Sequence, residues 1–264
     1  MKTIKFALRT LFRAPFVTAV AILSLALGIG ANAAIFSIFN QMLLSTLPVP
    51  APERLVNFSS PGPKQGSTSC NQAGDCDHVF SYPMFRDLQK MQTVFSDVAA
   101  HVTFGANLSF EGQTVSGEGM LVSGSYFPIL GVQPAAGRLL SSGDDQKVGE
   151  SPVVVLSHGY WTSRFGQRTD VINRTMVVNG QTLTIVGVAP LRFEGTTLGA
   201  TPEVFVPITL RGMMQPGFTG FANRRSYWAY LFARLKPGVS IDQARLGMGG
   251  IYRGLINDVE APLQ

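Results

Sequence analysis

The stretch LSLALGIGANAAIFSIFNQMLL, from Leu23 to Leu44, decides how the rest of the chain is organised. It carries no charge, and no charged residue occurs between Arg13 and Glu53. A helix that spans a bilayer needs about 20 predominantly apolar residues, whereas the apolar core of a signal peptide has about 7–15. The length of this stretch therefore predicts one transmembrane helix within residues 15–46.

A second interpretation of the same stretch is a cleaved signal peptide. Residues 31–33 (Ala-Asn-Ala) match the small-x-small pattern of a cleavage site, and a secreted enzyme is the hypothesis that would follow. Apolar residues continue past that site, however, at Ile35, Phe36, Ile38 and Phe39. Cleavage would leave a bare apolar helix in water at the new N-terminus, which is unfavourable. We therefore expect the segment to be retained.

Four cations precede the apolar stretch: Lys2, Lys5, Arg9 and Arg13. Because Lys and Arg accumulate on the cytoplasmic side of a membrane, they predict a cytoplasmic N-terminus and an exported domain from residue 47. Residues 1–14 also repeat apolar side chains at helical spacing, which is typical of an amphipathic segment in contact with membrane lipid.

Small residues recur every four positions in the predicted membrane helix. Such residues let a second helix approach closely in lipid, so we consider them candidates for helix packing. They are Ser24 and Gly28, and Ala26, Gly30 and Ala34. Gly is also generally frequent in membrane helices, and both explanations stay open.

The composition agrees with a membrane anchor followed by one domain. Only 14% of the 264 residues are charged, whereas about 25% is typical of soluble chains. The net charge is +5, but the basic residues after Arg13 form no run, which argues against nucleic-acid binding. We expect these remaining Arg and Lys side chains on the solvated surface.

The predicted exported domain, residues 47–264, begins with a stiff proline-rich link, LPVPAP. A helix is expected from Ser81 towards Ala100, with a buried stripe of Met84, Leu88, Met91 and Phe95. Strands are expected at 54–59, 151–157, 203–208 and 227–235; hairpins turn at 111–113 and at 179–180; short helices follow at 125–132 and 158–166; and a capping box at 240–243 opens a last helix. Strand–helix units at both ends of the domain flank a β-rich middle. The pattern predicts an α+β fold with two lobes, one α/β lobe made by both ends and one mainly-β lobe inserted between them.

Two cysteines, Cys70 and Cys76, flank a short loop rich in Gly, Asn and Asp. Their spacing suits a local disulfide if the loop faces an oxidising compartment. Two free thiols are a second interpretation. A metal site is a third, although only Asp77 and His78 lie nearby as further ligands.

Motifs of catalysis and cofactor binding are missing from the sequence. There is no phosphate-binding G-x-x-x-x-G-K-[ST], no dinucleotide fingerprint between a strand and a helix, and no G-x-S-x-G. Ser157 and His158 are neighbours, but a nucleophile and its base need an orienting partner. The paired acids Asp144 and Asp145 are interpreted as a solvated turn. We therefore expect no catalytic, cofactor or metal site, and no enzyme.

Several motifs, in order, resemble those of a known family. They are RTLFRAPFVTAVAILSLALGIGANAAIFSIFNQMLLSTLPVPAPERLV, FSYPMFRDL, VSGSYFPILGVQPAAGRLL, SPVVVLSHGYWTSRFG, VNGQTLTIVGVAP, RFEGT and RLKPGVSIDQA. Together they cover nearly the whole chain and are similar to MacB-like and FtsX-like ABC transporter permeases, more narrowly to the duplicated orphan permeases of acidobacteria.

The resemblance implies a MacB-like periplasmic core domain behind the first transmembrane helix, which would lie in the bacterial inner membrane. Family members continue with further transmembrane helices, so the chain looks like a truncated permease. The implied partners are a separate cytoplasmic ATPase, a second permease in a homo- or pseudo-dimer, and a periplasmic adaptor. The implied activity is the export or efflux of antibiotics, peptides or lipoproteins, driven by ATP hydrolysis on the cytoplasmic side. A membrane-anchored scaffold or sensor that binds a partner without transport is the alternative.

Overall fold

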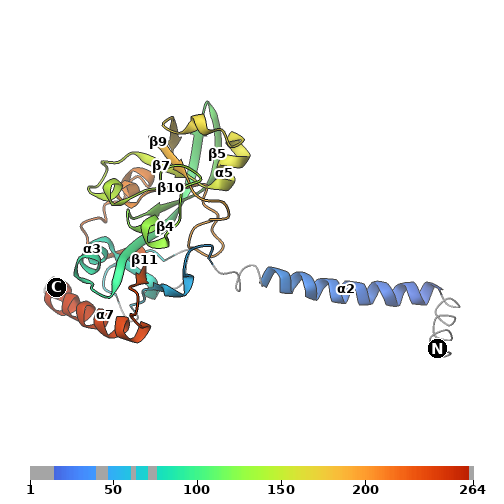
Figure 1. Ribbon diagram of the computed structural model, residues 1–264, viewed down its shortest axis with the longest axis horizontal. Helices are drawn as coiled ribbons and strands as arrows, with labels where there is room; N and C mark the ends of the chain where they lie inside the picture. The colour runs from blue at the N-terminus through green and yellow to red at the C-terminus, as the bar shows by residue number, and fades with distance from the viewer. Residues whose placement is uncertain (1–14, 40–46, 61–63, 71–75, 262–264) are drawn as a thin grey trace. The chain divides into compact units, whose positions relative to one another are not determined.

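The computed structural model describes residues 15–39, 47–60, 64–70 and 76–261 (Figure 1). The chain divides into two compact units, residues 1–46 and 47–264. In the first unit, helix α2 (Pro15–Phe39) has 25 residues. Its segment Pro15–Ser37 has a mean hydropathy of 2.1 and is, among the described residues, the one helix long and apolar enough to cross a membrane. The predicted amphipathic segment 1–14 lies outside the described residues.

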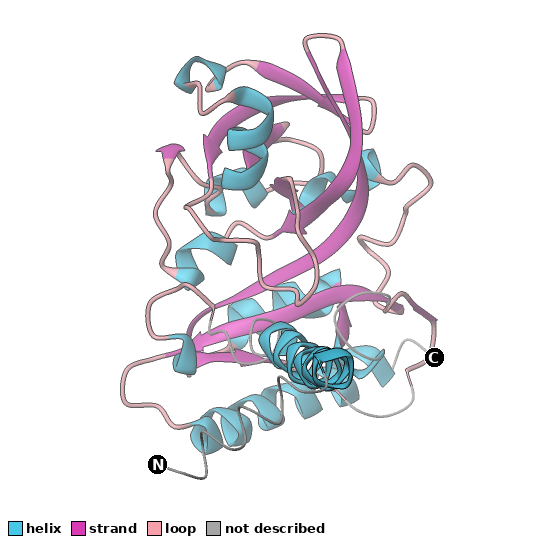
Figure 2. Ribbon diagram, turned by 90° about the vertical axis from the view of Figure 1, so that its right-hand side faces the viewer, coloured by secondary structure: helices cyan, strands magenta, loops and turns pink. Residues whose placement is uncertain are grey.

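Six strands of the second unit close into a ring. The ring is β4 (Phe95–Phe110), β5 (Gln113–Val122), β10 (Val204–Pro207), β7 (Val153–Leu156), β9 (Gln181–Val188) and β8 (Thr175–Val178), with β8 pairing back to β4. Figure 2 shows the long β4–β5 hairpin that forms one side of this barrel. β6 (Ala136–Gly137) pairs with β9 outside the ring.

The other end of the domain is a layer of strands covered by helices. Strand β11 (Ser226–Leu235) pairs with the first half of β4 and also with β1 (Leu55–Asn57), β2 (Ser67–Thr68) and β3 (Val79–Ser81). Helices α3 (Tyr82–Met91) and α7 (Ile241–Leu255) lie at this end (Figure 1). The mixed α and β fold behind one apolar helix is as predicted, and the two ends of the domain meet in one layer. The two parts are not separate sheets, however, because β4 belongs to both.

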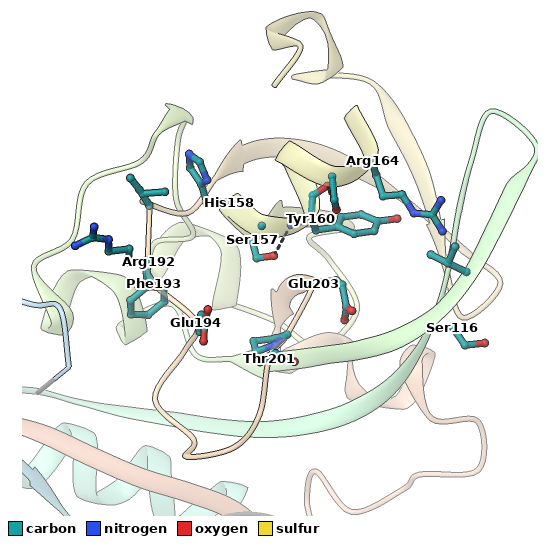
Figure 3. A pocket seen from close by; sticks show the side chains of 15 residues that line it. Ser116, Ser157, His158, Tyr160, Arg164, Arg192, Phe193, Glu194, Thr201 and Glu203 are labelled. Carbon is teal, nitrogen blue, oxygen red and sulfur yellow. Dashed lines mark hydrogen bonds between the residues drawn. The ribbon is translucent and has the colours of Figure 1, made fainter. Parts of the chain in front are cut away.

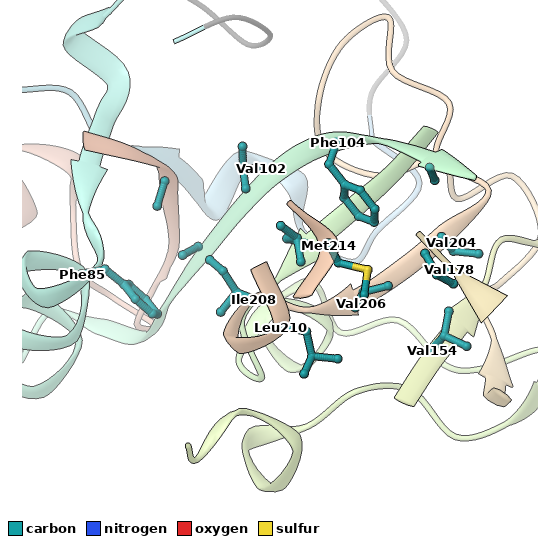
Figure 4. Packing of buried hydrophobic residues seen from close by; sticks show 14 of the residues in the cluster. Phe85, Val102, Phe104, Val154, Val178, Val204, Val206, Ile208, Leu210 and Met214 are labelled. Carbon is teal, nitrogen blue, oxygen red and sulfur yellow. The ribbon is translucent and has the colours of Figure 1, made fainter. Parts of the chain in front are cut away.

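Alternation along β4 produces the two hydrophobic clusters of the domain. Its even-numbered residues from Val98 to Leu108 enter one cluster, which fills the barrel and continues under α3 and α7 (Figure 4). Ala99 enters the second cluster, on the other face, with the short helix α4 (Tyr126–Leu130). Inside the barrel the Phe104 ring lies over Gly119, where a Cβ atom would be 2.4 Å from the ring. Gly119 therefore leaves the space that Phe104 occupies.

The helix predicted from Ser81 towards Ala100 is shorter than expected. Its start is confirmed, since the Ser81 hydroxyl accepts a hydrogen bond from the Met84 amide. Its end is not, because α3 stops at Met91, which is 48% exposed, and Phe95 begins β4. The Gln92 side chain accepts the Phe95 amide at 2.9 Å and stabilises the break. Pairing of β4 with β11 outweighs the helical spacing of Phe95, so the predicted stripe loses its last two members.

Both predicted hairpins are confirmed. Residues 111–112 and 179–180 all have positive φ, as a two-residue type I′ turn requires. Asn179 has a further role, since its side chain accepts the Asn107 amide at 2.7 Å and donates to the Gly105 carbonyl at 3.0 Å. The second hairpin thereby attaches to β4, where the barrel closes.

The remaining elements connect the strands. They are α5 (His158–Phe165), α6 (Arg211–Met214), the 3-10 turns Pro52–Arg54, Cys76–His78, Ser142–Asp145, Thr169–Val171 and Ile208–Leu210, and a π turn at Ile256–Glu260. The strands predicted around 54–59, 151–157, 203–208 and 227–235 and the capped last helix are all present.

Candidate functional site

An open cleft of about 510 Å³ lies between strand β5 and helix α5 (Figure 3). Helix α5 starts here because the Ser157 hydroxyl accepts the Tyr160 amide at 3.2 Å. The opposite wall comes from β5 and from the loop that precedes β10. The lining residues are Val115, Ser116, 157–160, Ser163, Arg164, 191–194 and 201–203.

The neighbours Ser157 and His158 do not form a nucleophile–base pair. The Ser157 hydroxyl is engaged as the helix cap, and Figure 3 shows His158 pointing away from it. The His158 ring instead lies 3.3 Å from the Thr162 hydroxyl and packs edge-to-face on Trp161. Acyl transfer needs a base within reach of the nucleophile, so this pair has structural roles.

Charges of both signs line the cleft. Arg164 and Arg192 lie towards its opposite ends, with Glu194 and Glu203 between them (Figure 3). Glu203 is held in place, since its carboxylate accepts the Glu118 amide at 2.6 Å. Burial is the main cause that raises the pKa of the Tyr160 hydroxyl, so Tyr160 is a neutral, largely apolar wall at pH 7. Such a cleft can hold a ligand, but no pair of groups in it is placed for proton transfer.

The paired acids Asp144 and Asp145 are buried, and their interpretation as a solvated turn is wrong. Asp144 is 7% exposed and receives two hydrogen bonds from Arg138, at 2.7 and 2.8 Å. Asp145 is 3% exposed and forms an ion pair with Arg86 of α3 at 2.9 Å. The sequence could not show this, because both arginines are supplied from outside the Ser/Gly loop.

Protonation of these two carboxyls follows their environments. Burial raises the pKa of Asp145 despite the nearby Arg86. Burial alone would also raise the pKa of Asp144, but hydrogen bonds from Arg138 and Ser141 outweigh it and lower that pKa. Asp145 thus fastens the Ser142–Asp145 turn to α3 through Arg86, Asp144 is bound by Arg138, and neither carboxylate is free for chemistry.

A second cleft, of about 470 Å³, lies beside β11 and contains His101. The His101 ring is 5% exposed and packs against Tyr126, Tyr230 and Phe232. Burial lowers its pKa to about 4, so the imidazole is neutral at pH 7. Among the described residues, no cluster of three or more His, Cys, Asp or Glu side chains has the arrangement of a metal site.

A family model described as the MacB-like periplasmic core domain matches residues 18–248. The chain belongs to this family. The resemblance to MacB-like permeases is thereby confirmed, while the narrower likeness to the acidobacterial proteins stays a prediction. A MacB-like domain behind a helix of membrane-spanning length is the arrangement of a membrane-anchored permease component whose domain lies outside the cytoplasm.

Two solved structures share the fold of the MacB-like domain. The periplasmic region of MacB from Actinobacillus actinomycetemcomitans matches with a TM-score of 0.57 and 14% identity, over 81% of this chain and 89% of that one. The extracellular domain of the noncanonic ABC-type transporter YknZ from Gram-positive bacteria matches with a TM-score of 0.51 and 15% identity, over 77% and 94%. Among curated proteins, no relative matches. At such identities the structures establish a common fold and carry over no site residues.

The two cysteines of the MacB-like chain are bonded to each other in the structure, with their Cα atoms 5.1 Å apart. The five candidate packing residues of the membrane segment all lie on α2. At about 100° per residue, Ala26, Gly30 and Ala34 form one stripe, and Ser24 and Gly28 another on roughly the opposite side. Asn32 continues the second stripe, and its side chain donates to the Gly28 carbonyl at 3.0 Å. Helix packing at these positions stays a prediction.

One arginine of the MacB-like domain, Arg211, is buried although the basic residues after Arg13 are expected on the solvated surface. Arg211 is 6% exposed, with its guanidinium carbon 4.0 Å from the Trp228 ring centre and 4.4 Å from that of Phe218. Burial lowers its pKa to about 10, so it remains charged at pH 7. No local pattern marks Arg211, because Trp228 lies on β11 and Phe218 in the loop before it, and only the fold brings both rings over the guanidinium.

Proposed function

We propose that this chain is the permease component, or the N-terminal part of one, of an ABC transporter that exports substrates such as antibiotics, peptides or lipoproteins. Its N-terminus would lie in the cytoplasm and its domain in the periplasm, beyond the inner membrane. The sequence carries no phosphate-binding loop, so ATP hydrolysis is assigned to a separate cytoplasmic ATPase. A second permease in a dimer and a periplasmic adaptor complete the proposed assembly.

The observation that carries the proposal is that one family match, residues 18–248, includes both the apolar helix and the domain. A domain with an independent role could be anchored by any apolar helix. A match that runs through both parts favours a function in which the helix and the domain act together.

The first residues of the domain are held against it, which supports mechanical coupling. Val49 is buried in the second hydrophobic cluster. Arg234 of β11 donates to the carbonyl of Ala51 at 2.8 Å and to that of Ile129, in α4, at 2.5 Å. Arg54, which follows the link, in turn donates to the Leu235 carbonyl of β11. These contacts, which we call the Arg234 clamp, give the proline-rich link a fixed path onto β11.

Arg234→Met tests the coupling, because it keeps an unbranched, mostly aliphatic stem and removes the guanidinium donors. The full chain is reconstituted in proteoliposomes with the ABC ATPase that co-purifies with it, and ATP hydrolysis and peptide efflux are measured. We expect the variant to insert and fold normally but to lose efflux. Arg253→Met is the matched control, since Arg253 is exposed and donates within its own helix, to the Gly249 carbonyl. Normal efflux by Arg234→Met would exclude the clamp as the transmitter.

Transport itself has a separate test. Two results together would replace the permease hypothesis by the scaffold or sensor hypothesis. They are that no ABC ATPase co-purifies with the full chain and that deletion of the chain from cells leaves efflux unchanged. Orientation is tested on intact cells by labelling Cys70 and Cys76 with an impermeant maleimide after mild reduction. Labelling that requires opened membranes would place the domain inside and overturn the proposed topology.

A further inference from the structure

One strand of the barrel is too short to cover its neighbour. β5 has ten residues, but β10 pairs in parallel only with its last four, from Gly119 to Val122. The chain before β10 leaves the barrel wall at Glu203, whose amide still donates to the Glu118 carbonyl at 2.8 Å. The edge of β5 from Gln113 to Gly117 therefore has β4 on one side and no strand of the described chain on the other.

The direction of the backbone N–H and C=O groups on that edge follows from the hydrogen-bond ladder between β4 and β5. Glu118 directs both its amide and its carbonyl away from β4, towards Glu203. In an antiparallel pair the hydrogen-bonding direction alternates from residue to residue. Thr114 and Ser116 therefore also point their N–H and C=O groups away from β4. Both residues are exposed, and no bond to these backbone groups occurs within the part of the chain that the structure describes.

This open edge lies in the cleft between β5 and α5. Val115 and Ser116 form one wall, and Tyr160, Ser163 and Arg164 face them from α5. Val115 and Tyr160 both pack on the barrel cluster, so the inner side of the cleft is apolar. At the inner end, Glu203 occupies the position above Gly117 and marks where the gap begins. The volume of about 510 Å³ is within the range of sites that bind ligands.

We propose that the cleft binds an extended polypeptide segment of a partner protein, which adds to β5 as a strand and continues the line of β10. Donors and acceptors that repeat about every 6.8 Å along a strand edge are matched by another extended backbone, and not by a compact small molecule. The inward residue of the segment meets Val115 and Tyr160 and is small and apolar. Because Arg164 and Glu194 line the cleft with opposite charges, a segment without net charge fits it. The proposal does not rest on transport.

Two substitutions at one position separate backbone recognition from side-chain recognition. Ser116→Pro removes the outward N–H, a change that a free strand edge tolerates, whereas Ser116→Ala keeps it. The probe is a library of acetylated and amidated octapeptides in which valine alternates with threonine or serine. Binding to the full chain in detergent is measured by fluorescence polarisation. We expect wild type and Ser116→Ala to bind alike and Ser116→Pro to bind about tenfold more weakly, since the loss of one backbone hydrogen bond is worth up to about 1.4 kcal/mol.

The thermal stability of the variants and the position of peptide cross-links provide the controls. Ser116→Pro should keep the thermal midpoint of the wild type, whereas Val115→Pro, whose N–H faces β4, should lower it. If Ser116→Pro does not fold, Thr114→Pro at the next outward position takes its place. A central photo-reactive benzoylphenylalanine in the peptide should cross-link within residues 113–118 or 158–164.

Three results would overturn the proposal. They are the absence of binding by any library peptide, equal binding to Ser116→Pro, and cross-links elsewhere in the domain. A fourth result would also overturn it: a change in the oligomeric state of the full chain on Ser116→Pro, without peptide, would assign the edge to a contact between copies.

Discussion

Acidification should destabilise the domain through His101. The imidazole lies on β4 among three aromatic rings, with its Nδ1 atom 3.4 Å from the Thr197 hydroxyl. Burial lowers the pKa to about 4 in the folded state, against about 6.5 in the unfolded chain. Because the unfolded state takes up the proton first, the stabilisation is complete above pH 6.5, is lost as the pH falls, and is gone below about pH 4.

The magnitude follows from the two pKa values. At pH 5 the unfolded histidine is almost fully protonated and the folded one is almost fully neutral. At about 1.4 kcal/mol for each pH unit below 6.5, the free energy of unfolding falls by about 2 kcal/mol between pH 7 and pH 5. Complete loss, below pH 4, amounts to about 3 kcal/mol.

Urea denaturation of the full chain at pH 7 and pH 5 measures this fall, and His101→Phe isolates its cause. A phenyl ring has a similar shape and does not titrate, so the variant should lose about 2 kcal/mol less than the wild type over the same interval. All other titratable groups are the same in both proteins, so their contributions to the pH dependence cancel in the difference. If the two proteins lose the same free energy, His101 is not neutral in the folded state, and the burial argument is wrong.

Further substitutions test the packing in the barrel, a buried carboxylate and a helix cap. Gly119→Ala should lower the free energy of unfolding in urea by about 1–3 kcal/mol, because its Cβ would meet the Phe104 ring at 2.4 Å, and Phe104→Leu in the same chain should recover part of the loss. Asp145→Ala should cost about 1–3 kcal/mol because it removes the buried carboxylate of an ion pair, whereas Asp170→Ala, in an exposed pair, should change the free energy of unfolding much less; equal losses would contradict this. Ser240→Ala should cost about 1 kcal/mol and speed amide exchange in the first turn of α7, since the hydroxyl caps the Gln243 amide; unchanged exchange would show that packing alone holds that turn.

Local signals were enough to predict the turns and caps of this fold. Asn179-Gly180 requires positive φ at both positions, and a type I′ hairpin follows from the two residues alone. Ser240 and Gln243 likewise cap each other within four residues. The end of α3 could not be predicted in this way. Phe95 has helical spacing from Leu88 and Met91, and only pairing with Leu235, far along the chain, makes it a strand residue.

The candidate cleft depends on contacts that are still more distant. Its walls come from β5, α5 and the loop before β10, and the gap exists because β10 is six residues shorter than β5 (10 against 4 residues). A strand's length is poorly marked in sequence, since its ends depend on the neighbours that continue to pair with it. Asp145 shows the same limit, because its partner Arg86 precedes it by 59 residues on another element.

One backbone ladder joins the proline-rich link to the cleft. Arg234 lies on β11, β11 pairs with β4 from Phe95 to His101, and β4 continues to Asn107, which pairs with Ser116 at the open edge. If this ladder transmits force, peptide binding in the cleft and the hold on the link must be coupled, and the coupling is reciprocal. Library peptides should then slow amide exchange in residues 47–54, and Arg234→Met should weaken peptide binding by a factor that matches the loss of that protection. If the peptides leave amide exchange in the link unchanged, β4 connects the clamp and the cleft structurally but carries no coupling free energy between them.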